Sequence, residues 1–357
     1  MARKSLVLAL ALSAGATIPQ VKSTTKAVLL LAEMLTPVKA LSAMPEPATS
    51  VVQLKDGRAD LYGEGDSLPG VVLVHGVAPG GPRDPRVIQV AQSISRLGRT
   101  VIAPYLAIGE QRLDPTDTER IRQSIDYLHG RTGGKVLVLA FSFGAAFSLV
   151  AMEEDPAIQD RVLELATVGT YFDLVHLLQG VTTGLVQTSG GLTGEWTPDR
   201  RAGRLVTEFL AKYLNDADER AVIRAYDDRN PEGLSPPARA IYEVMVNKDP
   251  ARTRELVNGL PGGLGQLISR LSPAAHIDRI EIPVSAMHSR QDPASPPSES
   301  ELLIAALEPP ATGRLTKVGS FRHVTPATGT GLLKDAGPLI GFVAGVFGAQ
   351  ERWGIHL

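Results

Sequence analysis

The stretch Ala140-Phe-Ser-Phe-Gly144 decides the fold, because of the segments on either side of it. Before it, Lys135–Leu139 is a short apolar run that predicts a buried strand. After it, Ala145–Glu154 has the composition of a helix. A serine on a tight strand-to-helix turn between small residues is typical of a nucleophile elbow, which lifts the serine hydroxyl above the edge of a sheet. The sequence therefore predicts that Ser142 is exposed and reactive.

The usual elbow pattern is Gly-x-Ser-x-Gly, and here alanine stands at its first position. Ala140 is still small enough for a strand and a helix to pack closely, so we expect the turn to form. The first free N–H groups of the following helix would point at the same place as the Ser142 hydroxyl. An ordinary strand-to-helix turn is the alternative interpretation of this pentapeptide, and the rest of the chain weighs against it.

An aspartate and a histidine follow two later predicted strands. Asp292 comes after the strand predicted at Ile282–Met287, and His323 comes after the strand predicted at Gly313–Val318. Catalytic residues of open α/β sheets collect on loops at strand ends. The order serine, acid, histidine is that of a hydrolytic triad on such a sheet. A serine hydroxyl needs a base, histidine is suited to that role near neutral pH, and a carboxylate orients the imidazole.

A glycine-rich loop follows an earlier apolar strand at Gly70–Val74. We expect its backbone N–H groups to face the substrate. The N–H of Val77 and that of Phe143 are the predicted oxyanion hole. His75 precedes the nucleophile strand, so a structural role is favoured for it over that of the base.

These motifs resemble the α/β-hydrolase superfamily, and in particular its serine esterase and dienelactone-hydrolase-like branch. The resemblance is carried by Val71–Gly81, Val136–Gly144, Ile282–Pro297 and Gly313–Val324, and it covers most of the chain from Val51 onward. Dienelactone hydrolases themselves use a cysteine, which this chain lacks. The resemblance implies a serine hydrolase of carboxylic esters that needs no cofactor.

Other assignments remain open at this point. Asp173 follows a predicted strand at Arg161–Val168 and is the alternative acid. An acyltransferase or a peptidase would use the same three residues. A hydrolase-fold protein that binds a small molecule or a partner without turnover belongs to a different class.

Alternating strand and helix patterns predict an α/β fold, with a mainly parallel central sheet flanked by helices. One connection is far longer than the usual few residues. We expect residues 171–271 to form a mostly helical cap inserted between the two parts of the core, 48–170 and 272–357. An oligomerisation surface is the alternative role for this insertion, and the oligomeric state cannot be read from the sequence.

Composition excludes several classes. The chain has 357 residues and no cysteine, which excludes disulfides and a thiol nucleophile. Its formal net charge of −2 gives no electrostatic reason to expect nucleic-acid binding. No metal-binding spacing and no P-loop is present, so no metal or nucleotide is expected. A small-molecule ester is the expected partner.

The N-terminal 47 residues form the predicted extension. Arg3 and Lys4 precede an apolar run that ends in Ser13–Ala16, as in a secretory signal or signal anchor. Export or membrane association is therefore favoured over a cytoplasmic location. Packed helices are the alternative, and Ala27–Leu35 with its Glu33 predicts a packed or interfacial helix.

Overall fold

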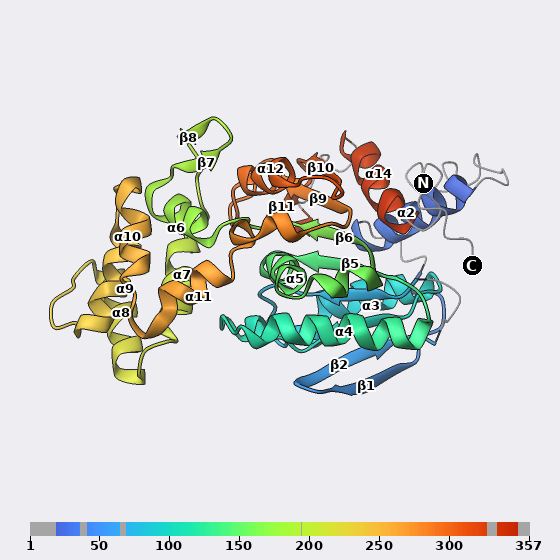
Figure 1. The fold of residues 1–357 in the computed structure, drawn as a ribbon, viewed down its shortest axis with the longest axis horizontal. Helices are drawn as coiled ribbons and strands as arrows, with labels where there is room; N and C mark the ends of the chain where they lie inside the picture. Colours follow the sequence, from blue (N-terminus) through green and yellow to red (C-terminus); the bar gives the residue numbers. More distant parts are fainter. Residues whose placement is uncertain (1–18, 36–40, 65–68, 194, 327–333, 349–357) are drawn as a thin grey trace.

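The computed structural model describes residues 19–35, 41–64, 69–193, 195–326 and 334–348. Within them, eight strands form one sheet in the order β1-β2-β4-β3-β5-β6-β9-β10 (Figure 1). Only the pairs β1–β2 and β2–β4 are antiparallel, so the predicted mainly parallel sheet is confirmed. The strands are β1 (Thr49–Leu54), β2 (Gly57–Tyr62), β3 (Val71–Val74), β4 (Val101–Pro104), β5 (Val136–Phe141), β6 (Val162–Val168), β9 (Val284–Ser289) and β10 (Gly313–Val318).

Helices cover both faces of this sheet, as its buried apolar strands require. On one face, α4 (Thr116–Thr132), α5 (Phe143–Glu154) and α12 (Pro297–Ala306) pack against alternate strand residues such as Val72 and Val74. On the other face, α2 (Pro19–Leu35), α3 (Pro85–Arg96) and α14 (Ala336–Phe347) pack against the intervening residues, such as Val71 and Leu73. The period of two along β3 thus divides the core into two layers.

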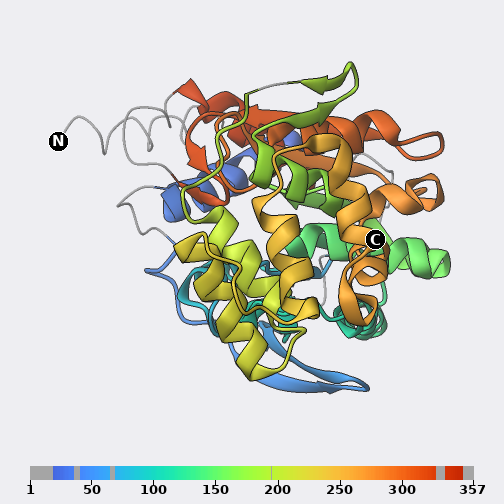
Figure 2. The same ribbon diagram turned by 90° about the vertical axis from the view of Figure 1, so that its left-hand side faces the viewer.

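The chain between β6 and β9 leaves the sheet and forms a separate group of helices at one end of the molecule (Figure 1). We call residues 171–271 the inserted segment. Figure 2 views the molecule from this side, with the helices in front of the core. The elements are α6 (Leu174–Thr183), the hairpin β7 (Val186–Thr188) and β8 (Gly191–Thr193), α7 (Ala202–Ala211), α8 (Asp216–Asp228), α9 (Pro236–Val246), α10 (Thr253–Asn258) and α11 (Leu264–Arg270).

Helix α2 lies beside α14 and α3, at the opposite end of the molecule from the inserted segment (Figure 1). Its Glu33 is buried and accepts hydrogen bonds from the backbone N–H groups of Leu41 (2.9 Å) and Ser42 (3.3 Å), and from the Ser42 hydroxyl. The charged residue within this apolar helix therefore joins it to the chain that follows.

The predicted signal or anchor at residues 3–16 lies outside the described residues. Among the helices that the structure describes, none is long and apolar enough to cross a membrane.

Candidate active site

Ser142 occupies the sharp turn between β5 and α5. Its φ of 51° and ψ of −125° are strained for a residue with a side chain. Its N–H donates to the carbonyl oxygen of Val168 on β6 at 2.8 Å, which ties the turn to the neighbouring strand. Gly144 permits the close approach of α5 to β3, because a Cβ there would overlap the carbonyl oxygen of His75. This is the backbone geometry that the elbow motif predicts.

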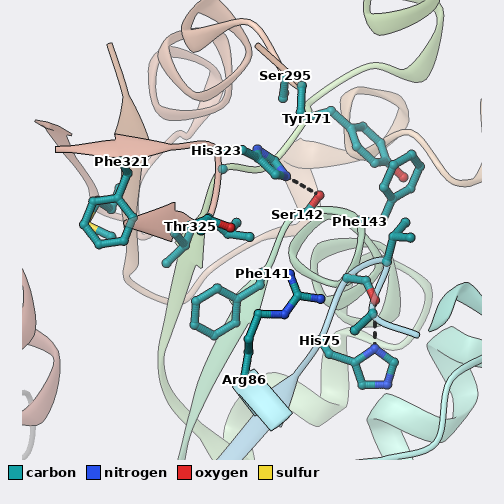
Figure 3. Close-up of a pocket in the computed structure, with 18 of the residues that line it drawn as sticks. His75, Arg86, Phe141, Ser142, Phe143, Tyr171, Ser295, Phe321, His323 and Thr325 are labelled. Carbon is teal, nitrogen blue, oxygen red and sulfur yellow. Dashed lines mark hydrogen bonds between the residues drawn. The ribbon is translucent and has the colours of Figure 1, made fainter. Parts of the chain in front are cut away.

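The strands β11 (Phe321–Arg322) and β12 (Thr325–Pro326) form a hairpin with a two-residue turn. His323 lies in this turn, and its side chain reaches Ser142. Its backbone is left-handed, with a φ of 57°. The imidazole Nε2 lies 2.8 Å from the Ser142 Oγ, as Figure 3 shows. A base that is to take the serine proton must lie at this kind of distance.

Asp292 lies on the loop after β9, with its side chain fully buried. Its Oδ2 is 2.8 Å from Nδ1 of His323, and its Oδ1 accepts from the N–H groups of Ala294 and Ser295. Burial alone would raise the pKa of Asp292, but hydrogen bonds from His288 and His323 outweigh burial and hold the pKa well below its usual range. Asp292 is therefore a carboxylate that can fix the imidazole tautomer and stabilise an imidazolium.

Three further residues shape this site, and no sequence motif indicates the part of Gly169 or Trp196 in it. Gly169, directly after β6, has a φ of 65°, and a Cβ there would lie 3.0 Å from Nδ1 of His323. His288 is buried at the end of β9, with Nε2 3.3 Å from Oδ2 of Asp292 and Nδ1 2.7 Å from the Ser300 hydroxyl. Trp196 of the inserted segment donates from its indole to the carbonyl oxygen of Asp292 at 2.6 Å.

The backbone N–H groups of Val77 and Phe143 lie where the loop after β3 meets the elbow. Gly76 lies directly against the elbow, because a Cβ at Gly76 would be 2.8 Å from the Cβ of Ser142 and 3.4 Å from the nitrogen of Phe143. Neither N–H donates a hydrogen bond to any of the residues that the structure describes. Both N–H groups are therefore available to donate a hydrogen bond.

The structure places the other two candidates away from the hydroxyl. His75 is buried with its Nδ1 2.8 Å from the carbonyl oxygen of Gly76, and burial lowers its pKa. Asp173 caps α6, accepting from the Val175 N–H at 2.7 Å, and pairs with Arg254 at 3.2 Å. Both side chains have contacts other than those of the Ser142–His323–Asp292 chain of hydrogen bonds.

A cavity of about 650 Å³ opens over Ser142 and His323. In one direction it runs between the elbow and the inserted segment, where Phe143, Tyr171, Leu177 and Phe209 line it. In the other direction it runs along the sheet face beneath α2, α3 and α14. Figure 3 shows these sides, with Phe143 and Tyr171 to one side of Ser142 and Phe321 and Thr325 to the other. A cavity of this size suits a small molecule.

Over the described part of the chain, no group of three or more acidic, histidine or cysteine side chains is placed to hold a metal ion.

The strand order and the serine at the end of β5 define the α/β-hydrolase fold, and the chain has this fold. No protein-family model matches the chain, and no curated protein matches it. Solved structures similar to it include a serine hydrolase from the polyaromatic-hydrocarbon-degrading bacterium Cycloclasticus zankles (15% identity, 76% of this chain and 89% of that chain, TM-score 0.40). Another is 2-hydroxy-6-oxo-6-phenylhexa-2,4-dienoate hydrolase from Rhodococcus sp. strain RHA1 (18% identity, 83% and 99%, TM-score 0.43).

A third is the acylaminoacyl peptidase of Pyrococcus horikoshii (12% identity, TM-score 0.47), where the match covers 79% of this chain and 38% of that chain. Identities and TM-scores this low carry no argument about activity. The fold is defined by the strand order and by the geometry of the elbow.

Proposed function

We propose that the protein is a serine hydrolase that cleaves carboxylic esters through an acyl-enzyme. One observation carries this proposal: an unbroken chain of two 2.8 Å hydrogen bonds joins the Ser142 hydroxyl, the His323 ring and the Asp292 carboxylate. A binding protein has no physical need for an aligned nucleophile, base and orienting acid. The strained backbone of Ser142 supports the same reading, since such strain collects at functional sites.

In the proposed reaction, Ser142 Oγ attacks the ester carbonyl carbon while its proton passes to Nε2 of His323. The resulting oxyanion accepts hydrogen bonds from the N–H groups of Val77 and Phe143. The carbon–oxygen bond to the alcohol then breaks, and His323 returns the proton to the departing alcohol. Water, deprotonated by His323, attacks the acyl carbon. The bond from that carbon to Ser142 Oγ then breaks, His323 returns the proton to Oγ, and the carboxylic acid leaves. Asp292 stays ionised throughout and stabilises the imidazolium.

We further propose that the inserted segment, residues 171–271, is a cap over this site. Its Phe209 stacks on Phe143 of the elbow, with ring centroids 5.4 Å apart, and Trp196 bonds to the Asp292 loop. These contacts would shield the site from bulk water.

The test is labelling with a fluorophosphonate probe, read by intact mass, on the wild type and on Ser142→Ala. One adduct on the wild type and none on the variant is the expected result, followed by turnover of an ester panel. Absence of an adduct on folded wild type would sink the proposal in favour of a non-catalytic binding protein. Products that appear only with an added acceptor alcohol or amine would indicate an acyltransferase, and cleavage of amides but not esters would indicate a peptidase.

A further inference from the structure

The second direction of the cavity is an apolar chamber on the sheet face opposite α5. It is bounded by the sheet below and by three helices above, and it is continuous with the space over Ser142. We call it the α2 chamber. Its wall is formed by Leu31 and Met34 of α2, Val90 of α3, Phe141 of β5, and Val343 and Val346 of α14.

The side chains of this wall adjoin the core but are not fully packed against it. Leu31, Met34, Val90 and Val343 are only partly buried, although they adjoin the apolar cluster of this layer. Protein cores normally leave few gaps between such residues. The space beneath α2 is therefore a cavity with an apolar lining. Such a lining offers water no hydrogen-bond partners.

Helix α2 is held over the chamber at both ends. At its C-terminal end, buried Glu33 binds the N–H groups of Leu41 and Ser42, and its carbonyl oxygen accepts from Gln89 of α3 at 3.3 Å. At its N-terminal end, Ser23 lies against Gly348, where a Cβ would be 3.2 Å from the serine hydroxyl oxygen. The helix is thus a fixed wall of the chamber.

The charged residue of α3 that lines the cavity is already neutralised. Arg86 lines the cavity, and its guanidinium pairs with Asp84 through two hydrogen bonds of 2.8 and 2.9 Å. Figure 3 shows this guanidinium near Phe141, on the side of Ser142 away from Tyr171. A matched ion pair does not call for an anionic ligand, whereas the wall beyond it is hydrocarbon. The chemistry of the chamber therefore selects an uncharged alkyl chain.

We propose that the α2 chamber holds the long hydrocarbon chain of the ester that Ser142 attacks, so that α2 is part of the substrate-binding wall. This inference rests on the proposed function, and it names the substrate class as esters with one extended alkyl chain. Each methylene that enters the chamber raises kcat/KM by up to about fourfold, until the chamber is full. The chain belongs to either the acyl or the alcohol half of the ester, and two substrate series separate these cases.

The test measures kcat/KM for p-nitrophenyl esters of two to twelve acyl carbons, and for butyrate esters of alcohols of increasing length. Val343→Trp fills the chamber. We expect it to lower kcat/KM at least about tenfold for the longest chain of the responsive series and to leave the shortest ester within about twofold. Ile340→Trp is the matched control, because it places the same ring on the same helix outside the cavity lining and should change neither.

Met34→Ala enlarges the chamber and should move the optimum to longer chains, which tests the proposal even if the tryptophan variant does not fold. The proposal is overturned if neither series rises with chain length in the wild type. It is also overturned if Val206→Trp, on the cap side of the cavity, removes the long-chain preference while Val343→Trp leaves it intact. Failure of the proposed function has a different signature: folded wild type would then react with neither ethyl nor dodecyl fluorophosphonate.

Discussion

The indole Nε1 of Trp196 donates a hydrogen bond to the main-chain carbonyl oxygen of Asp292. Trp196 belongs to the inserted segment, and the Asp292 carboxylate is hydrogen-bonded to the His323 ring. The inserted segment therefore contacts the core of the chain at Asp292. Trp196 also packs on α6, where a Cβ at Gly180 would lie 3.2 Å from its ring. The position of Asp292 thus depends on a residue from outside the sheet.

Trp196→Phe removes this hydrogen bond and keeps a ring in the same place. A lost hydrogen bond of this kind is worth about 1 kcal/mol, so we expect kcat/KM to fall about fivefold while the protein stays folded. Ester kinetics and thermal unfolding measured together check this. An unchanged kcat/KM would show that the Asp292 loop keeps its position without the inserted segment.

Asp292→Asn should lower kcat by roughly three to four orders of magnitude. The side-chain oxygen of the asparagine would still accept the hydrogen bonds from the N–H groups of Ala294 and Ser295. Its NH2 group would then face Nδ1 of His323 and donate a hydrogen bond to it. The ring proton would then lie on Nε2, the nitrogen that faces Ser142. Protonated Nε2 cannot accept the proton of the Ser142 hydroxyl, so His323 could not act as the base.

The matched control for that change is Asp173→Asn, because Asp173 is the alternative acid from the sequence. Its carboxylate pairs with Arg254 and caps α6, so we expect kcat to stay within about tenfold of the wild type. Steady-state kinetics on both variants decides the assignment. A larger loss of kcat from Asp173→Asn than from Asp292→Asn would reverse the two roles.

Gly144→Ala should destabilise the protein by at least about 3 kcal/mol, because its Cβ would overlap the carbonyl oxygen of His75 and push α5 away from β3. Gly341→Ala on α14 is the control. It is a glycine within a helix, its Cβ would meet nothing within 4 Å, and a gain of up to about 1 kcal/mol is expected. Denaturant titration measures both, and equal stabilities would contradict this account of the elbow.

Stability should depend on pH through Glu299. This side chain is fully buried, accepts from the N–H groups of Phe172 and Asp173, and faces the side chains of Asp173 and His176. Burial, only partly offset by these N–H donors, raises its pKa from 4.5 to about 7. Between these values the folded protein holds a proton that the unfolded chain has released. The free energy of unfolding therefore falls as the pH rises through this range.

Glu299→Gln keeps an oxygen for the two N–H donors and cannot ionise. The variant should match the wild type near pH 4 and exceed its stability at pH 8 by up to on the order of 3 kcal/mol. Unfolding midpoints at several pH values provide the measurement. A wild-type profile that is flat between pH 4.5 and 7, or one that the variant reproduces, would contradict the assignment.

Much of the fold and of the site follows from local sequence patterns. The strands before Ser142, Asp292 and His323 are short and bounded by turn residues, so their chain order alone predicts where each side chain emerges. Strand β1 is the exception in the sheet. It is an exposed edge strand paired only with β2, and its exposed residues give it no apolar run to detect.

The parts that could not be predicted depend on contacts between distant segments. The β11–β12 hairpin, whose turn contains His323, lacks the Asn-Gly or Gly-rich turn by which a short hairpin is predicted from sequence. The apolar pattern of α2 predicts a helix, but not that it covers the sheet face between α3 and α14. Likewise, one tryptophan among several aromatics of the inserted segment carries no local sign that it binds the Asp292 loop.

Ser142 and His323 are 181 residues apart in sequence, and Asp292 is 31 residues from His323. During synthesis, the strained serine turn can therefore form long before any base exists to activate it. Chemical reactivity would arise only when the His323 hairpin docks, and a chain that ends before His323 would remain inert. Fluorophosphonate reactivity thus reports the docking of this hairpin, and it should not precede recovery of helical signal during refolding.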